Sequence, residues 1–316
     1  MKMPGTLSVG RAIGTGLKYA LLSAYLLAVV FPMVWVIYTS AKSTQDIYKN
    51  PFGLPRLITQ PSRESAQPLV RNYRNAWVKS GFSRYFFNSV KVVTISLVLT
   101  LLFGAMAAYA LARFVFFGRN AIYMLFLSGL IIPVQLIVIP LFFQFSAMGD
   151  GLTSLLRPAA SSLGLGRLTV SLHDSHEGLI LIYVAFSLPF TIFVLTAFFR
   201  TLPNELREAA LMDGCSEFRV FWSVMMPIAK PGLVTAAIFN ALGLWNEYLF
   251  GLVFINSDAL KTLPLGLASM SMQAQYKSDF GLLFAGLVIA MLPTLLVYLF
   301  LQEKLTRGIT VGALKG

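Results

Sequence analysis

The chain has 316 residues, of which 57% are hydrophobic and only 12% are charged, and its formal net charge is +12. Soluble globular domains carry about twice that charged fraction, so the composition excludes this class and indicates an integral membrane protein. The basic residues fall between long apolar runs, which favours lipid head groups over nucleic acid as their partner. The single cysteine, Cys215, excludes a disulfide framework.

Six apolar stretches are long enough to cross a membrane as helices, for which about 20 residues are needed. They cover residues 19–40, 88–112, 121–147, 178–199, 232–255 and 280–302. Lipid offers no hydrogen-bond partner to an open strand, so we predict an all-α integral membrane protein with six transmembrane helices. The first stretch exceeds the apolar region of a signal peptide, about 7–15 residues, and we expect it to be retained. We treat residues 1–316 as one transmembrane domain.

Two long segments separate these stretches on the side that we assign to the outside. Residues 41–87 are rich in Pro, Arg and Ser, and we expect partial order over the outer face. Residues 149–177 carry Gly, Ser and Pro breaks, which predict a loop with one short helix. Counts of Lys and Arg favour cytoplasmic N- and C-termini, although the basic residues between 42 and 84 nearly cancel that bias.

The segment between the fourth and fifth stretches, residues 201–231, is charged and has a helical pattern. Pro203 suits a first helical position, and Glu205 falls in the first turn, where an acid complements the helix dipole. Gly214 fits a left-handed stop, and a second short helix is expected from Ser216 onward. A helix of about ten residues is marginal alone in water, so it needs a surface to pack against. We predict docking on another protein; an interfacial helix on lipid is the alternative.

The same segment carries a motif with fixed spacing. Glu208-Ala209-Ala210, three further residues and then Gly214 resemble the EAA loop of ABC importer permeases. After nine further residues, Val224-Met225-Met226-Pro227 stands where the longer form of that motif has Ile-x-Leu-Pro, with the proline kept. The loop also lies before the last two spans, as in that family.

Other segments resemble the carbohydrate-uptake branch of this family, the MalG-like permeases, so that the resemblance covers nearly the whole chain. The matching segments are Asn72-Tyr73-Arg74 with Phe87-Asn88-Ser89, Ile132-Pro133-Val134-Gln135 with Ile139-Pro140-Leu141-Phe142, Trp245-Asn246-Glu247-Tyr248, Thr262-Leu263-Pro264-Leu265-Gly266-Leu267, and the tail from Gly308 to Gly316. Residues 149–177 depart from the branch because they are longer than its pattern leads us to expect.

The resemblance implies a type I ABC importer permease of a prokaryotic cytoplasmic membrane that moves a sugar or oligosaccharide. Glycerol-3-phosphate-type and polyol substrates are the alternatives within the family. The implied partners are a cytoplasmic ABC ATPase dimer, a second homologous permease in a heterodimer, and an extracytoplasmic solute-binding protein. The ATPase is expected to meet the EAA loop, which would form a coupling helix through Glu208, Ala209, Ala210, Asp213 and Gly214.

The chain has no G-x-x-x-x-G-K-[ST] phosphate loop. We therefore expect it not to be an enzyme and to bind no cofactor itself, with ATP and Mg held by the partner ATPase subunits. We also expect no catalytic residue, no metal site and no nucleic-acid partner.

Four polar residues inside the predicted spans are candidates for the translocation pathway or its gate. They are Gln135, Asn240, Asn246 and Glu247. A carboxyl inside a span is costly unless it is paired or wetted, so for Glu247 structural bonding or gating competes with sugar contact. The Gln135 amide suits a sugar hydroxyl, and equally a backbone carbonyl freed by a nearby proline.

His173-Asp174-Ser175-His176-Glu177 has the residue types of a metal site, but no further His exists in the chain. We expect a solvated polar turn instead. Two other functions compete with the permease. An ion-coupled secondary transporter would rely on intramembrane acids and internal repeats, and would work without an ATPase. A membrane enzyme built on the histidines would lose activity with His173→Ala or His176→Ala.

Overall fold

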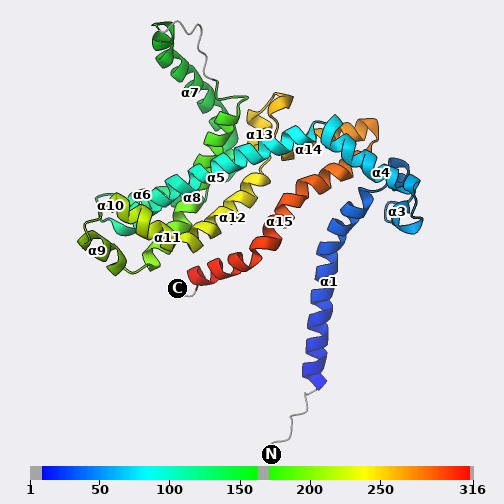
Figure 1. Cartoon of the computed structure of the whole chain (residues 1–316), viewed down its shortest axis with the longest axis horizontal. Coiled ribbons are helices and arrows are strands. Elements are labelled where there is room, and N and C mark those ends of the chain that lie inside the picture. The colour runs from blue at the N-terminus through cyan, green and yellow to red at the C-terminus, as the bar shows by residue number, and fades with distance from the viewer. Residues whose placement is uncertain (1–8, 163–170, 314–316) are drawn as a thin grey trace, which may run out of the picture. The chain divides into compact units, whose positions relative to one another are not determined.

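The computed structural model describes residues 9–162 and 171–313, which form helices joined by turns, with no β-strand among them (Figure 1). The predicted all-α fold is confirmed. The chain forms two compact units, Met1–Gly81 with Ser269–Ile289 and Phe82–Ala268 with Ala290–Gly316. The single permease domain over residues 1–316 stays a prediction.

Five helices of the described part are long and apolar enough to cross a membrane. They are α1 (Val9–Thr39), α5 (Phe82–Arg113), α7 (Val134–Ser162), α8 (His176–Thr201) and α15 (Phe280–Ala313). A sixth crossing results if Glu217–Ile228 and α12 (Lys230–Trp245), which are bent by 74° at their junction, count as one span. Hydrophobic length therefore located most of the spanning helices.

The predicted third span, residues 121–147, is not one continuous helix. Helix α6 (Arg119–Ser128) ends before a turn at residues 129–133, and α7 begins at Val134. Pro133 has no N–H to donate and disfavours helical geometry at the residue before it, which explains the break. The turn stays apolar, so hydropathy alone gave no sign of it.

The segment at residues 149–177 is more helical than predicted, because α7 continues through its first half to Ser162. Leu152, Leu155 and Leu156 are strong helix formers, and they outweigh Gly149 and Gly151 in this stretch. Residues 163–170 lie outside the described residues.

The fifth predicted span, residues 232–255, is interrupted after Trp245, and α13 (Leu249–Phe254) follows. The Glu247 carboxylate accepts hydrogen bonds from the backbone N–H groups of Phe250 at 2.7 Å and Gly251 at 3.3 Å. A carboxylate at that position satisfies the free N–H groups of a new helix, which explains the restart.

In the first unit, the residues after α1 form short helices and are therefore more ordered than predicted. These are α2 (Thr44–Lys49), α3 (Arg56–Thr59), α4 (Arg63–Arg74) and the π-helical turn η1 (Asn75–Lys79). Ser62 and Ser65 form a reciprocal capping box at the start of α4. The buried Asn72 amide donates to the carbonyls of Ser40 at 2.9 Å and Lys42 at 2.8 Å, which ties α4 to the end of α1.

In the second unit, α5 and α8 pack against each other through small residues. A Cβ added at Gly104 would lie 2.5 Å from Thr191 Cγ2, and Ala105 and Ala108 are fully buried. Small residues let membrane helices approach closely, so this pair forms the frame of the unit. The remaining elements are η3 (Asp258–Leu260), which lies in this unit, and α14 (Leu263–Lys277), whose residues from Ser269 onward belong to the first unit.

Candidate functional site: the 201–231 loop and an intramembrane cavity

The 201–231 loop folds into short helices beside one end of α5 and α8 (Figure 1). They are α9 (Glu205–Met212), α10 (Glu217–Val220), the π-helical turn η2 (Phe221–Met225) and α11 (Met226–Ile228). Gly214 has φ +80°, and after it the N–H of Cys215 donates to the Ala210 carbonyl at 3.0 Å. The expected first helix, left-handed glycine stop and second helix are all present.

An apolar cluster attaches the loop to the spanning helices. Val220 and Met225 are fully buried, and they pack in one cluster with Tyr109 of α5 and with Leu195 and Phe199 of α8. Close-packed interiors transmit displacement because they contain few voids. The loop is therefore closely packed against α5 and α8.

The structure divides the EAA residues between the interior and the surface. Ala210 is buried in the chain's own cluster, while Glu208, Ala209, Asp213 and Gly214 are exposed. The small-residue face expected from Ala209 and Ala210 is thus split, because Ala210 lets α9 approach this chain's own helices. The exposed four remain available to a partner.

Arg113, the last residue of α5, joins the end of α8 to the start of the loop. Its guanidinium donates to the carbonyls of Phe199 and Leu202, both at 2.7 Å, and to the side-chain oxygen of Asn204. A cation at a helix C-terminus satisfies free carbonyls and complements the helix dipole. The motif did not point to Arg113, because its partners lie far along the chain.

An ion pair locks the two halves of the loop together. Arg207 of α9 donates to both carboxylate oxygens of Glu217 of α10, and Tyr109 of α5 donates to the same carboxylate at 3.4 Å. Hydrogen bonding to Glu217 raises the pKa of Arg207, so this arginine stays charged. The ion pair fixes the angle between α9 and α10.

Apolar side chains add to the free surface of the loop. Met212 is 88% exposed and Phe218 is 68% exposed. Met212 directly precedes the exposed Asp213 and stands four residues after the exposed Glu208. The motif does not include Met212 or Phe218. An apolar residue on the side of α9 opposite Ala210 is the signal that could have found Met212. Exposed apolar side chains in a charged loop suit protein docking.

A second feature of this unit is a cavity of about 350 Å³ lined by the 129–133 turn, α8 and α12. Phe186, Phe190 and Phe239 supply aromatic walls, and Ser187 and Asn240 supply polar groups. The Asn240 amide donates to Thr191 Oγ1 at 2.7 Å, which holds the amide in place. The break in the third predicted span thus contributes to a partly polar cavity.

The structure brings together two of the four pathway candidates. Asn240 and Glu247 both line the cavity, whereas Gln135 and Asn246 are exposed and do not line it. Glu247 also accepts a hydrogen bond from Tyr183 at 2.7 Å, in addition to its bonds at the start of α13. Its carboxylate therefore has a structural role, which was one of the two predicted alternatives. Asn246 donates to the Leu242 carbonyl at 2.8 Å.

The His173–Glu177 segment is packed rather than solvated, contrary to the prediction. His176 is buried and lies 3.0 Å from the Leu260 carbonyl, and the His173 ring stacks on Phe254. Asp174 accepts hydrogen bonds from the N–H groups of Asn256 at 2.9 Å and Ser257 at 2.8 Å. These long-range partners were invisible in the sequence. Among the described residues, no group of three or more His, Cys, Asp or Glu could hold a metal.

Comparisons with known proteins identify relatives over most of the chain. It is 41% identical over 300 residues to the diacetylchitobiose uptake system permease protein NgcG of Streptomyces coelicolor, covering 95% of this chain and 88% of the relative. It is 32% identical to the trehalose transport system permease protein SugB of Mycobacterium tuberculosis, covering 91% and 93%.

The fold matches that of a solved transporter. A crystal structure of a bacterial ABC transporter involved in the import of the acidic polysaccharide alginate aligns with a TM-score of 0.71 at 20% identity, covering 95% of this chain and 99% of that one. A family model described as binding-protein-dependent transport system inner membrane component matches residues 100–311. This chain is therefore a multi-pass membrane protein of the binding-protein-dependent transport system inner membrane component family.

Proposed function

We propose that this chain is the permease subunit of an ABC importer that carries a sugar or oligosaccharide across the cytoplasmic membrane. The observation that carries the proposal is the construction of the 201–231 loop. The loop is fixed to α5 and α8 by an apolar cluster, and it leaves Glu208, Met212 and Asp213 exposed. A partner that pulls on this surface moves two spanning helices with it.

The partner at the loop is an ABC ATPase dimer that holds ATP and Mg, so this chain carries no hydrolysis itself. Cytoplasmic N- and C-termini place the loop on the ATPase side of the membrane. A second homologous permease completes the pore as a heterodimer, and an extracytoplasmic binding protein delivers the solute. The family description names binding-protein dependence, which supports the last partner. The tail from Gly308, a second candidate ATPase contact, lies outside the residues whose side chains are described.

The substrate class follows from the relatives and the cavity. Relatives are named for diacetylchitobiose, arabinooligosaccharides and trehalose, which are all carbohydrates. Aromatic walls with a few fixed polar groups, such as Asn240 and Ser187, suit a sugar passing through the membrane. Polyols and glycerol phosphates are the alternatives within the family.

A matched pair of glycine variants tests the proposal. Gly214 and Gly118 have φ +80° and +83°, and nothing lies within 4 Å of a Cβ built on either. Gly214→Asp and Gly118→Asp therefore carry a similar local backbone strain, which aspartate tolerates better than most residues. We expect Gly214→Asp alone to abolish co-purification of the ATPase and uptake in the reconstituted complex, with normal membrane insertion.

Two outcomes reject the proposal. If both variants lose uptake equally, the loss reports strain rather than docking. If Gly214→Asp keeps the ATPase and full uptake, the loop is a structural connector. Uptake by the permease pair without any ATPase would establish the secondary-transporter alternative.

A further inference from the structure

The chain turns back along α1 directly after leaving it. Phe52 places its ring 6.4 Å from the ring of Phe31 and 5.7 Å from that of Trp35, between ring centroids. These residues precede Thr39, the last residue of α1, by eight and four positions. With a rise of about 1.5 Å per residue, Phe52 lies about 6–12 Å below the end of this spanning helix. Pro51 and Phe52 thus lie beside the last turns of the apolar helix α1 rather than beyond its end.

The backbone carbonyls of residues 50–52 accept hydrogen bonds from side chains of the protein, so they do not depend on water. Side chains from the last turns of α1 and from Lys42, just after it, donate to the carbonyls of residues 50, 51 and 52. The bonds run from Trp35 Nε1 to Pro51 at 2.9 Å, from Tyr38 Oη to Phe52 at 3.0 Å, and from Lys42 Nζ to Asn50 at 2.8 Å and Pro51 at 3.2 Å. Non-helical backbone at membrane depth is tolerated only when its polar groups are satisfied internally.

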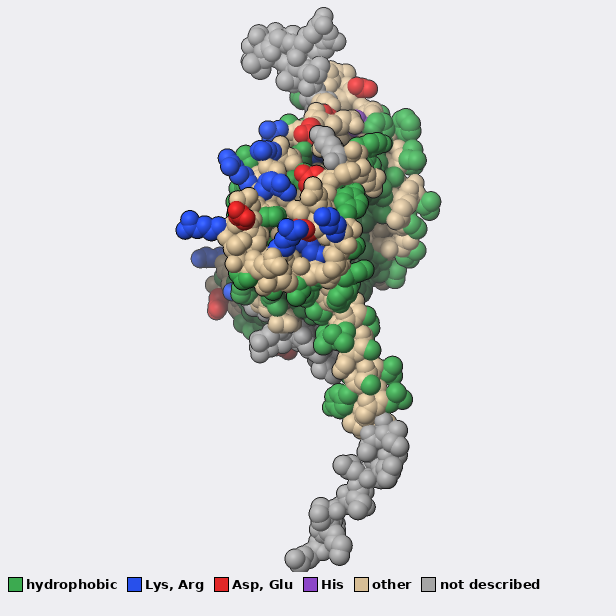
Figure 2. All heavy atoms as spheres, turned by 90° about the vertical axis from the view of Figure 1, so that its right-hand side faces the viewer, with side chains coloured by type: hydrophobic (Ala, Val, Ile, Leu, Met, Phe, Trp, Pro, Cys, Tyr) green, Lys and Arg blue, Asp and Glu red, His purple; other side chains and the backbone are tan. Residues whose placement is uncertain are grey.

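The outward side of the segment is apolar with a basic edge. Phe52 and Leu54 are 68% and 55% exposed, and Ile58 is exposed beside them. Lys49 and Arg56 flank these residues and are also exposed. Figure 2 shows Lys and Arg side chains gathered on the face that carries this part of the chain, with hydrophobic side chains next to them. This composition is typical of surfaces that lie in the membrane interface.

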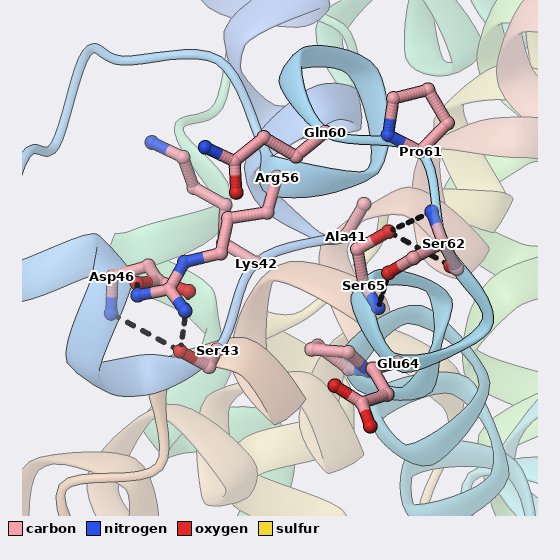
Figure 3. A pocket seen from close by; sticks show the side chains of 11 residues that line it. Ala41, Lys42, Ser43, Asp46, Arg56, Gln60, Pro61, Ser62, Glu64 and Ser65 are labelled. Carbon is pink, nitrogen blue, oxygen red and sulfur yellow. Dashed lines mark hydrogen bonds and ion pairs between the residues drawn. The ribbon is translucent and has the colours of Figure 1, made fainter.

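An ion pair positions one of the two basic residues of this edge, Arg56. Arg56 pairs with Asp46 at 2.8 Å, and the two residues lie with Lys42 on one side of a polar cavity of about 490 Å³ (Figure 3). The Arg56 side chain is still 65% exposed, so one face of its guanidinium remains free for a lipid phosphate.

We propose that residues 50–58 form a lipid anchor, inserted into the membrane leaflet at the C-terminal end of α1. Phe52, Leu54 and Ile58 enter the acyl boundary, and Lys49 and Arg56 bind lipid phosphates. The occupant is lipid because the anchor continues the surface of α1, whose apolar spanning window has no buried residue within this chain. The positive edge complements phosphate head groups.

Site-directed spin labelling in the assembled transporter tests this assignment. Cys215 is replaced by Ser, and single cysteines are introduced as Phe52→Cys, Leu54→Cys and, as a control on exposed α4, Gln67→Cys. The complex is reconstituted in vesicles of phosphatidylethanolamine and phosphatidylglycerol. We expect labels at 52 and 54 to collide more with oxygen than with a water-soluble nickel complex, and the label at 67 to show the reverse order.

Two results would overturn the lipid anchor. Greater collision with nickel at both 52 and 54 would place the segment in water. Low collision with both reagents, together with an immobilised spectrum, would show that a protein subunit covers it. Agreement between the two positions guards against a local effect of either substitution, and uptake by each labelled complex verifies that it has folded.

Discussion

The 201–231 loop and the 41–81 segment resemble each other in sequence character but are held in opposite ways. Both are charged, lie outside the spanning helices and consist of short helices started by serine caps such as Ser216 and Ser62. The loop is anchored by buried apolar side chains, with Met225 fully enclosed. The 41–81 segment is anchored by side chains that donate to backbone carbonyls, with Asn72 as the central donor.

The difference bears on what each region can do. An apolar cluster that includes Leu195 and Phe199 of α8 makes the 201–231 loop part of the closely packed frame of its unit, as the proposed coupling role requires. In the 41–81 segment, hydrogen bonds to individual carbonyls fix the backbone without a large apolar core. The apolar side chains of this segment can therefore face outward instead of inward.

The largest expected effect comes from the apolar anchor of the loop. Met225→Ala should lower the free energy of unfolding by about 2–5 kcal/mol, because it leaves a cavity in a fully buried site. Met212→Ala is the matched control, since Met212 is almost fully exposed in the same loop. Unfolding in detergent measures both, and equal shifts would contradict the apolar anchoring described here.

The next effect concerns the polar anchor of the 41–81 segment. Asn72→Ala should cost about 1–3 kcal/mol, because it leaves the buried carbonyls of Ser40 and Lys42 without their donor. Asn75→Ala, just beyond α4 at a half-buried position, serves as the control. Thermal unfolding in nanodiscs provides the measurement. A loss larger than that of Met225→Ala would reverse the comparison between the two regions.

A smaller effect should come from the ion pair inside the loop. A double-mutant cycle of Arg207→Ala and Glu217→Ala should give a coupling energy of about 0.2–1 kcal/mol, because both side chains are partly solvated. Each single variant should reduce uptake clearly while lowering the free energy of unfolding only slightly, since the pair sets the angle between α9 and α10. Full uptake in both single variants would show that this angle does not matter for coupling.

The smallest effect is a pH dependence outside both regions. Hydrogen bonds from Ser257 lower the pKa of Asp174, so its folded-state pKa lies below the unfolded one. The tie to residues 256–257 is therefore complete at neutral pH and is lost as the pH falls through that lowered pKa. Hydrogen exchange at residues 255–258, corrected for intrinsic rates, should rise in acid. Asp174→Asn, which cannot lose a charge, should show no such rise.

Sequence reasoning succeeded where local chemistry decides the structure. The left-handed Gly214, the α9 helix before it and the helix starting after Ser216 depend on neighbouring residues, and all three are present. The resemblance to importer permeases also rested on contiguous motifs, and the family comparison confirms it. The docking role of Glu208 and its neighbours stays a prediction.

Reasoning from sequence failed where a residue's burial or hydrogen bonding depends on partners far away in the chain. Ala210 faces inward because α5 and α8 provide its site, and His176 is buried because Leu260 provides a carbonyl. Arg113 went unnoticed for the same reason, since its acceptors at 199 and 202 are brought close only by the packing of two long helices.

The sequence by itself determined that this is an all-α membrane protein, roughly where its helices span, and which loop carries the permease motif. Those properties follow from hydrophobic length and from short-range turn chemistry. Only the tertiary structure showed that the 129–133 turn lines a cavity and that Ala210 is buried while the other EAA residues are exposed. It alone also showed that Phe52 packs back against α1. Each of these depends on which apolar faces meet, and a hydrophobic run does not specify its partner.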